Sequence, residues 1–288
     1  MSETRLHPLR RGRDVPVNRM AVRPGGIRES EDHVAAEEPL ELRAGGRPLA
    51  VVMRTPGDDE ALAAGFFLTE GLIRGPEDIE RVAHCTDVPP EAMSNVIDVT
   101  LAPGVPDPLE RGRRSFYASS SCGICGKSSI DEIRQQAAPL ASGAVIAPEA
   151  LTRLVPALRS AQVTFDRTGG LHAAGLFRFD GTLIATAEDV GRHNAVDKIV
   201  GGRLLLGDWP LSERLLLVSG RVGFEIVQKA WLAGIPAIAA VSAPTSLAVA
   251  LAVEARMTLV GFLRGEDYNV YAGSERLGLG AMGRGESH

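Results

Sequence analysis

The chain has 288 residues, of which 44% are hydrophobic and 23% charged, and its formal net charge at pH 7 is −5. This length allows a substantial core and two folding units, and the acidic balance argues against a general nucleic-acid-binding protein, whose surface would be basic. Three cysteines in so long a chain do not form a disulfide framework, so the C-x-x-C pair Cys122 and Cys125 indicates redox, sulfur or metal chemistry in a reducing compartment.

Residues 1–32 are rich in arginine, proline and glycine and show no hydrophobic period, which predicts a disordered basic tail. They contain no apolar stretch of the kind that a secretory signal needs. The apolar run 230–253 is long enough to cross a bilayer, but Pro236 and Pro244 interrupt it, so we interpret it as part of a buried strand–helix unit. We therefore expect a cytoplasmic protein with neither a membrane nor a nucleic acid as partner.

Residues 33–110 are predicted to form a small α+β domain. The expected elements are a hairpin over 39–52 with its turn at Gly45-Gly46, a helix that begins near Thr55 and is capped by Thr55 or Asp58, and a strand over 94–101. Cys85 lies within this domain without a cysteine partner nearby in the sequence, and we interpret it as a small buried side chain.

Residues 111–138 are predicted to be a basic linker followed by a mobile loop that holds the two paired cysteines. The spacing of Ile130 and Ile133 predicts a helix over 128–136, directly after the loop. The dipole of this helix and the charge of Lys127 both favour the thiolate form of a nearby cysteine. Cys122 and Cys125 are therefore expected to be nucleophilic thiols and not buried structural cysteines.

Residues 139–288 are predicted to form an α/β domain. The expected elements are a helix over 148–161, hairpin strands over 172–179 and 182–186, helices over 192–199, 224–233 and 245–256, and strands over 215–219, 236–241 and 258–263. Because the last three strands are apolar on both faces, we expect a hairpin joined to parallel strands, with helices covering both sides of the sheet.

The order of these elements is similar to that of zinc-dependent nucleoside deaminases, which use H-x-E followed by P-C-x-x-C. Ala174 stands where the catalytic glutamate would be, and Val190 and His193 stand at the two cysteine positions. The fold prediction is therefore a cytidine-deaminase-like three-layer domain, with a mixed sheet and helices on both faces, that lacks the zinc site and cannot catalyse hydrolytic deamination.

Polar residues follow the strands of this domain, where open α/β sheets bind their ligands. The candidate binding residues are His172, Arg192, His193, Ser219, Arg221, Thr245, Ser246 and Arg264. Backbone N–H groups beside these arginines would suit a large phosphorylated ligand. For any single cluster a purely structural role is equally well supported, but several together favour a site. Asp197 and Lys198 are interpreted as members of structural ion pairs.

Five motifs stand in order along the chain: S-C-G-I-C-G-K at 121–127, T-G-G-L-H-A-A at 168–174, E-D-V-G-R-H-N-A-V-D-K at 188–198, S-A-P-T-S at 242–246 and G-F-L-R-G at 261–265. Together they resemble the formate dehydrogenase accessory sulfurtransferase family, FdhD. The resemblance extends from about residue 39 to about residue 271, which is nearly all of the chain predicted to fold.

The resemblance implies a sulfurtransferase that accepts persulfide sulfur from a cysteine desulfurase. It would transfer this sulfur to the molybdenum of the bis(molybdopterin guanine dinucleotide) cofactor, bound as a substrate, before the cofactor enters formate dehydrogenase. The lost deaminase ligands predict that no zinc is bound. The resemblance also implies that Cys122 carries the persulfide, that Cys125 is a second thiol, and that the protein is a homodimer. The cofactor-binding stretch would be Phe262, Leu263, Arg264, Gly265, Glu266 and Asp267, in which the last two residues are acidic where relatives often carry a second basic residue.

Three other functions remain open. A thiol–disulfide oxidoreductase would also use a C-x-x-C pair. A zinc-stabilised binding protein would use Cys122 and Cys125 with Cys85 or His84 as ligands, although structural zinc takes four protein ligands. A non-catalytic guanine-nucleotide- or cofactor-binding chaperone would use the polar strand ends and leave the cysteines incidental.

Overall fold

The computed structural model describes residues 12–112, 137–140 and 145–280. Cys122, Cys125 and the helix predicted over 128–136 lie outside these ranges. The strands are β1 (Asp14–Arg23), β2 (Gly26–Ala35), β3 (Glu38–Ala44), β4 (Arg47–Arg54), β5 (Ile79–His84), β6 (Val96–Leu101), β7 (His172–Arg178), β8 (Leu183–Asp189), β9 (Arg214–Val218), β10 (Ala237–Ala240), β11 (Thr258–Arg264) and β12 (Asp267–Ala272). The helices are α1 (Asp59–Thr69), α2 (Pro108–Gly112), α4 (Pro148–Ala161), α5 (Val163–Thr168), α6 (Arg192–Leu205), α7 (Phe224–Leu232) and α8 (Ser246–Glu254).

The larger sheet has six strands in the order β12-β11-β10-β9-β7-β8. Strands β9, β10 and β11 are parallel to one another, while β7 runs antiparallel to both β8 and β9, and β12 antiparallel to β11. The predicted hairpin joined to parallel strands is confirmed as a mixed sheet. Strand β12, which the sequence analysis did not predict, continues the sheet beyond β11.

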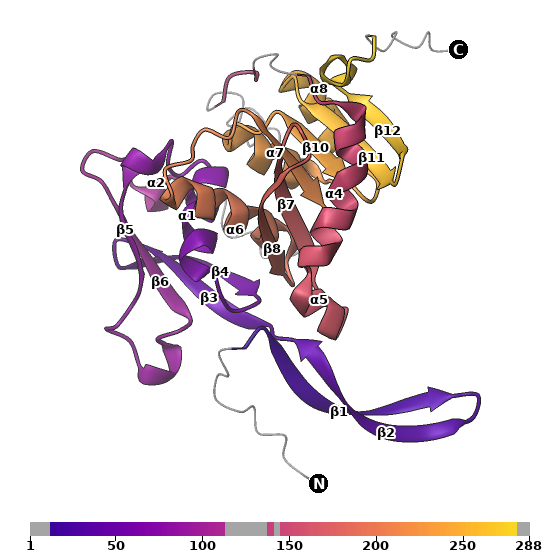
Figure 1. Ribbon diagram of the computed structural model, residues 1–288. Helices are drawn as coiled ribbons and strands as arrows, with labels where there is room; N and C mark the ends of the chain where they lie inside the picture. The colour runs from indigo at the N-terminus through magenta and orange to yellow at the C-terminus, as the bar shows by residue number, and fades with distance from the viewer. Residues whose placement is uncertain (1–11, 113–136, 141–144, 281–288) are drawn as a thin grey trace.

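Helices cover both faces of this sheet, as predicted (Figure 1). Alternate residues of a strand point to opposite faces, so Leu215 and Leu217 pack with α4 while Leu216 and Val218 pack with α6, α7 and α8. All four side chains are buried. Residues 215–218 of β9 are therefore all apolar, because neither face of the strand meets solvent there.

A second sheet has four strands in the order β4-β3-β6-β5. We call this sheet, together with α1, the first unit. Leu40, Leu42 and Ile97 on one face of this sheet pack against α1, and α1 in turn packs against α6. The predicted hairpin, helix and strand of this unit are confirmed, and β5 is an addition. One continuous hydrophobic cluster extends from the small sheet through α1 to the large sheet, so the two units share a core.

Two details of the first unit differ from expectation. Asp58 occupies the N-cap position of α1, but it has a left-handed φ of 57° and its side chain makes no capping hydrogen bond; its carboxylate pairs with Arg13 instead. Cys85 is half-buried beside Arg43 and not fully enclosed, and burial raises the pKa of its thiol.

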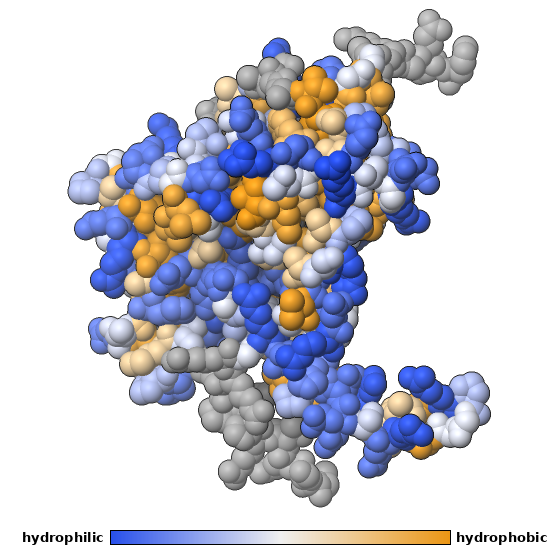
Figure 2. Space-filling model, in the orientation of Figure 1, coloured by the Kyte–Doolittle hydropathy of each residue, from blue (hydrophilic) through white to orange (hydrophobic). Residues whose placement is uncertain are grey.

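The prediction of a disordered tail is wrong for residues 14–32. Strands β1 and β2 form an antiparallel hairpin that projects from the body, and β2 crosses the expected boundary at residue 33 (Figure 1). The hairpin surface is largely hydrophilic (Figure 2). Its charged side chains pair between the strands and with α5, as in Arg19–Asp32 at 2.7 Å and Arg167–Asp14 at 2.9 Å. Pro24 and Gly25 form the turn between the two strands, and this pair is the signal in the sequence that could have predicted the hairpin. The other proposed domain boundaries remain predictions.

Helices α1 and α6 approach each other closely through two glycines. A Cβ atom added to Gly201 would lie 1.9 Å from the carbonyl oxygen of Ala61, and one added to Gly65 would lie 1.9 Å from the carbonyl oxygen of Asp197. These partners are backbone atoms, which cannot rotate away. Both helices therefore require glycine at their contact.

We predict that Gly201→Ala lowers the free energy of unfolding by about 3 kcal/mol or more, because the added methyl group forces the two helices apart. Gly202→Ala is the matched control, since its Cβ would lie 3.8 Å from the nearest atom, the Cβ of Ala61; there the better helix propensity of alanine should stabilise by up to about 1 kcal/mol. Urea unfolding measures both variants. Equal stability of the two would contradict the close contact.

Candidate functional site

The candidate site is the edge of the large sheet at which β9, β10 and β11 end; we call it the carboxyl edge. Strand β8 also ends there and β7 begins there, because each antiparallel pairing reverses the chain. Helices α6, α7 and α8 begin directly after β8, β9 and β10. Three helix N-termini, each with partial positive charge, therefore lie along one edge.

Backbone contacts between neighbouring loops give this edge a fixed shape. The N–H of Val222 donates to the carbonyl of Ala243 at 3.2 Å, and the N–H of Thr245 donates to the carbonyl of Val222 at 2.9 Å. The N–H of Phe262 donates to the carbonyl of Ser242 at 3.2 Å. The loop after β9, the loop after β10 and the last residues of β11 are thus joined in series.

His172, Arg192, His193 and Ser219 are brought together at the end of the edge formed by β7, β8 and β9. The hydroxyl of Ser219 accepts from the N–H of Ala173 at 2.9 Å and so joins the start of β7 to the end of β9. A Cβ at Gly220 would lie 3.4 Å from Nδ1 of His172, so the loop after β9 lies directly against this ring. These four of the predicted binding residues therefore lie together in space.

Both imidazoles in this cluster favour the neutral form. Burial, followed by the charge of Arg192, lowers the pKa of His172. Burial, followed by the charges of Lys229 and Arg192, lowers the pKa of His193 to about 3. The nearest carboxylate, that of Glu225, lies 3.9 Å from Nε2 of His193. At neutral pH the rings can offer a hydrogen bond without adding charge.

The remaining predicted binding residues lie along the rest of the edge. Arg221, Thr245 and Ser246 are exposed, and the hydroxyl of Thr245 caps α8 by accepting from the N–H of Ala248 at 3.3 Å. Arg264, Gly265, Glu266 and Asp267 form the exposed turn between β11 and β12. Phe262 is 38% exposed, whereas the side chain of Leu263, 1% exposed, packs in the core under α4.

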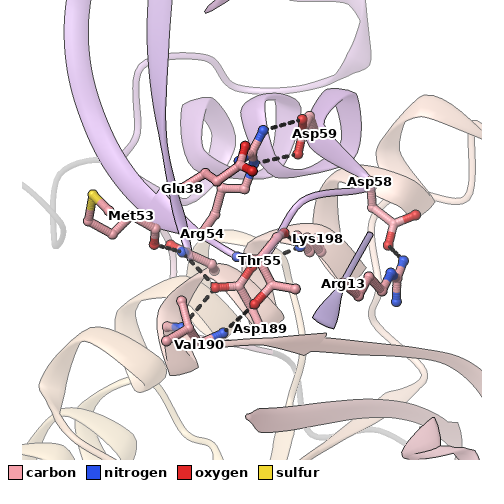
Figure 3. Close-up of polar contacts among 12 residues, drawn as sticks. Arg13, Glu38, Met53, Arg54, Thr55, Asp58, Asp59, Asp189, Val190 and Lys198 are labelled. Atoms are coloured by element: carbon pink, nitrogen blue, oxygen red, sulfur yellow. Dashed lines mark hydrogen bonds and ion pairs between the residues drawn. The ribbon is translucent and has the colours of Figure 1, made fainter. Parts of the chain in front are cut away.

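A buried ion pair that the first unit completes holds the β8–α6 turn behind this cluster (Figure 3). Nζ of Lys198 lies 2.8 Å from Oδ2 of Asp189, and both side chains are at most 1% exposed. Thr55 of the first unit surrounds the pair: its N–H donates to Asp189 at 3.1 Å, its carbonyl accepts from Lys198 at 2.8 Å, and its hydroxyl accepts from the N–H of Val190 at 3.1 Å.

Asn194 adds a second contact between the same two units. Its side-chain amide donates to the carbonyl of Met53 at 2.8 Å and to Oδ1 of Asp189 at 2.9 Å. The N–H of Gly191 also donates to Oδ1 of Asp189, at 2.8 Å. The motif E-D-V-G-R-H-N-A-V-D-K thus combines structural residues (Asp189, Asn194 and Lys198) with residues at the candidate site.

A second buried network ties α1 to α6 and α7. Nζ of Lys229 lies 2.9 Å from Oδ2 of Asp197 and 2.8 Å from Oε1 of Glu70, and the hydroxyl of Thr69 donates to Asp197 at 2.7 Å. Burial by itself would lower the pKa of Lys229, but the two carboxylates outweigh it and hold this pKa above its usual range. The structural role predicted for Asp197 and Lys198 is confirmed.

Sequence reasoning missed Thr55 as a partner of the site, since it considered this residue only as a helix cap. Its partners lie more than 130 positions away, at Asp189 and Val190. The one signal in the sequence was the charged pair Asp189 and Lys198. Apolar residues surround Lys198 in the sequence, which indicates that this lysine is buried and needs a partner. Such a signal shows that a partner exists but not where it lies.

The carboxyl edge suits an anionic ligand. Nε of Arg192 and Nε2 of His193 are shielded from solvent and contact no hydrogen-bond partner within the described ranges. Unpaired buried polar atoms are costly, so a ligand that supplied partners for these two atoms would be favoured. Together with the exposed Arg221 and Arg264 and the helix N-termini, they fit phosphate groups.

A pocket of about 370 Å³ lies elsewhere, between the start of α1 and the end of α6. Its lining includes Asp58, Asp59, Glu60 and His84, and this acidic surface would repel phosphates. Among the described residues, no group of three or more His, Cys, Asp or Glu side chains could hold a metal ion. No helix in the described part of the chain is long and apolar enough to cross a membrane.

We predict that Lys198→Met lowers the free energy of unfolding by about 3–5 kcal/mol, because it leaves the carboxylate of Asp189 buried without its counter-charge. Arg47→Met is the control: Arg47 lies 2.8 Å from Asp107, but its side chain is 59% exposed, and loss of such a pair costs about 0–1 kcal/mol. Denaturant unfolding distinguishes the two. A loss below about 1 kcal/mol for Lys198→Met would show that the pair does not hold the junction.

We predict that His193 makes the fold less stable in acid. Because its pKa is about 3 in the folded protein and near 6.5 when unperturbed, the unfolded chain binds the proton first. The stabilisation is fully present above pH 6.5 and is lost progressively as the pH falls toward 3. His193→Gln should show a smaller loss of stability between pH 7 and 5 than the native protein. An imidazole titration near pH 6.5, measured by NMR, would contradict this.

Comparison with known proteins places the chain in a family. The FdhD/NarQ family profile matches residues 35–278. The chain is 52% identical over 270 residues to a protein of Streptomyces coelicolor named sulfur carrier protein FdhD, covering 92% of this chain and 96% of that one. A Mycobacterium tuberculosis protein of the same name is 46% identical over 275 residues, with coverage of 93% and 97%.

A solved structure agrees with these sequence matches. A crystal structure described as a formate dehydrogenase accessory protein of Desulfotalea psychrophila superimposes with a TM-score of 0.74 at 28% identity, covering 92% of this chain and all of that one. The mixed α/β fold, the family profile and the full-length relatives lead to one conclusion. The chain belongs to the FdhD/NarQ family.

Proposed function

We propose that the protein is a sulfur carrier that serves formate dehydrogenase. It accepts persulfide sulfur from a cysteine desulfurase at Cys122 and transfers it to the molybdenum of the bis(molybdopterin guanine dinucleotide) cofactor, which it binds as a substrate. The observation that carries the binding half of the proposal is the carboxyl edge, with its three helix N-termini and the unpaired Nε of Arg192. The relatives named sulfur carrier protein support the transfer half.

The cofactor substrate fits the carboxyl edge by charge. Each guanine dinucleotide half carries a diphosphate, and helix N-termini and guanidinium groups are the usual partners of phosphate oxygens. Arg264 in the β11–β12 turn would contact a phosphate in the exposed part of the edge. The acidic Glu266 and Asp267 in the same turn would face away from it, because like charges repel.

Sulfur loading is a thiol exchange. The thiolate of Cys122 attacks the outer sulfur of the donor persulfide, so a new S–S bond forms on Cys122 while the donor S–S bond breaks and leaves a donor thiolate. For delivery, the thiolate of Cys125 can attack the inner sulfur of Cys122. The outer sulfur then leaves as sulfide, and the two electrons that it gains come from the Cys122–Cys125 disulfide that forms.

The proposal includes several further expectations. The protein would act in the cytoplasm as a homodimer, with the desulfurase and formate dehydrogenase as its partners. Its large sheet with helices on both faces would be a cytidine-deaminase-like scaffold, in which a binding edge has replaced the zinc site.

A non-catalytic cofactor-binding chaperone is the second candidate. The same carboxyl edge favours it, because this edge can bind phosphates without any cysteine. The two functions differ in one respect: a chaperone would activate formate dehydrogenase equally well with or without Cys122.

We predict that Cys122→Ala abolishes sulfur loading and leaves stability unchanged. Intact-mass measurement after incubation with a cysteine desulfurase and cysteine should show one added sulfur on the native protein and none on the variant. Cys85→Ser is the control and should load normally, since its half-buried thiol has a raised pKa and little thiolate. Loading of the Cys122→Ala variant at the native level would contradict the proposal.

A further inference from the structure

Glu225 places a carboxylate beside the cluster at the carboxyl edge, whose other side chains are neutral or cationic. It is the second residue of α7, and its Oε2 lies 3.9 Å from Nε2 of His193 at the start of α6. This distance is too long for a hydrogen bond, and nothing else in the described part of the chain donates to the carboxylate. The dipole of α7 favours a negative charge at this place, but the capacity of Glu225 to accept hydrogen bonds is unused.

Two further polar atoms beside Glu225 are unpaired. Nε2 of His193 and Nε of Arg192 are shielded from solvent and have no hydrogen-bond partner among the described residues. Burial keeps His193 neutral, with a pKa of about 3, so Nε2 can accept a hydrogen bond when the ring proton is on Nδ1. The guanidinium of Arg192 can only donate. The three side chains therefore offer two acceptors and one donor.

This combination does not match phosphate groups alone. An ionised phosphate presents only acceptors, and the carboxylate of Glu225 would repel it. The carboxylate needs a donor, and two acceptors 3.9 Å apart suit a group with two hydrogens, such as an amino group. A ring with a carbonyl, an N–H and an amino group in a row along one edge would supply partners for the donor and for both acceptors.

We propose that Glu225 is a specificity-determining residue that recognises this 2-amino-oxo edge on a ring of the ligand. Its carboxylate accepts from the ring N–H and from the amino group, Nε2 of His193 accepts the second amino hydrogen, and Nε of Arg192 donates to the carbonyl oxygen. Guanine has this edge and so does pterin, whereas hypoxanthine lacks the amino group. This specificity rests on the proposed function, in which the substrate carries both rings.

Calorimetry on the full chain tests the role of Glu225 without any sulfur-transfer reaction. The ring ligands are GDP and 6-hydroxymethyl-7,8-dihydropterin diphosphate, and pyrophosphate reports on phosphate binding alone. Glu225→Gln keeps the shape of the side chain and removes its charge. We expect this variant to bind at least one ring ligand at least tenfold more weakly than the native protein, because a charged hydrogen bond is lost. Pyrophosphate should bind as tightly as before or more tightly.

Glu213→Gln is the matched control. Glu213 is exposed and directly precedes β9, at the opposite edge of the sheet, and its substitution changes the net charge equally. This variant should bind every ligand as the native protein does. The ring ligand that Glu225→Gln weakens identifies whether guanine or pterin lies at Glu225.

If the ring is guanine, two analogues identify the group that is recognised. IDP, which lacks only the amino group, should bind the native protein at least tenfold more weakly than GDP, because the two acceptors would be left without a donor. In Glu225→Gln this preference should fall to threefold or less. Loss of affinity for 2′-deoxy-GDP in place of IDP would overturn the proposal, because the carboxylate would then bind the ribose.

The remaining outcomes separate this proposal from the proposed function. If Glu225→Gln weakens neither ring ligand, or tightens both together with pyrophosphate, the carboxylate only repels phosphate, and the specificity proposal is overturned while the anion-binding edge stands. If the native protein does not bind pyrophosphate or either ring ligand, the binding part of the proposed function fails and the specificity proposal fails with it.

Discussion

The ion pair between Lys198 and Asp189 is the interaction on which the rest of the structure depends. Removing two charges from water costs several kcal/mol for each ion, and the pair is tolerated because several neighbours form hydrogen bonds with it. Asp189 accepts from Thr55, Gly191 and Asn194 as well as from Lys198, and Lys198 also donates to the carbonyl of Thr55. Since Thr55 belongs to the first unit, the pair is fully satisfied only when both units are folded together.

This dependence connects the core to the candidate site. Asp189 ends β8 and Arg192 begins α6, so the residues that fix the turn are immediate neighbours of those that line the carboxyl edge. The glycine contact between α1 and α6 sets the distance between the two units. Without the first unit the turn would lose the partners of Asp189 and Lys198, and Arg192 and His193 would lose their fixed positions. The first unit is in this sense part of the candidate site.

The sequence predicted most of this fold because its local signals were strong. The apolar strands β9, β10 and β11 and the helices after them were placed within a few residues, and α4 was predicted at its observed bounds, 148–161. Prediction from the sequence failed where an element or a residue is stabilised by partners far along the chain. The β1–β2 hairpin reads as a polar tail because its charges pair between strands, and Thr55 acts through residues far along the chain. The site residues were predicted from motifs, but only the structure shows which of them share one end of the edge. Cys122 and Cys125 lie outside the described residues.

In the proposed function, sulfur carried by Cys122 reaches a cofactor held at the carboxyl edge. The most direct measurement is the recovery of activity by sulfur-deficient formate dehydrogenase supplied with persulfide-loaded protein, comparing Arg264→Ala with Arg178→Ala. Both arginines are exposed, but Arg178 ends β7 at the opposite edge of the sheet. Both variants should load sulfur normally, and reactivation should be at least tenfold slower with Arg264→Ala alone, as expected for loss of one charged hydrogen bond of about 1.5–3 kcal/mol. Equal reactivation by the two variants would contradict it.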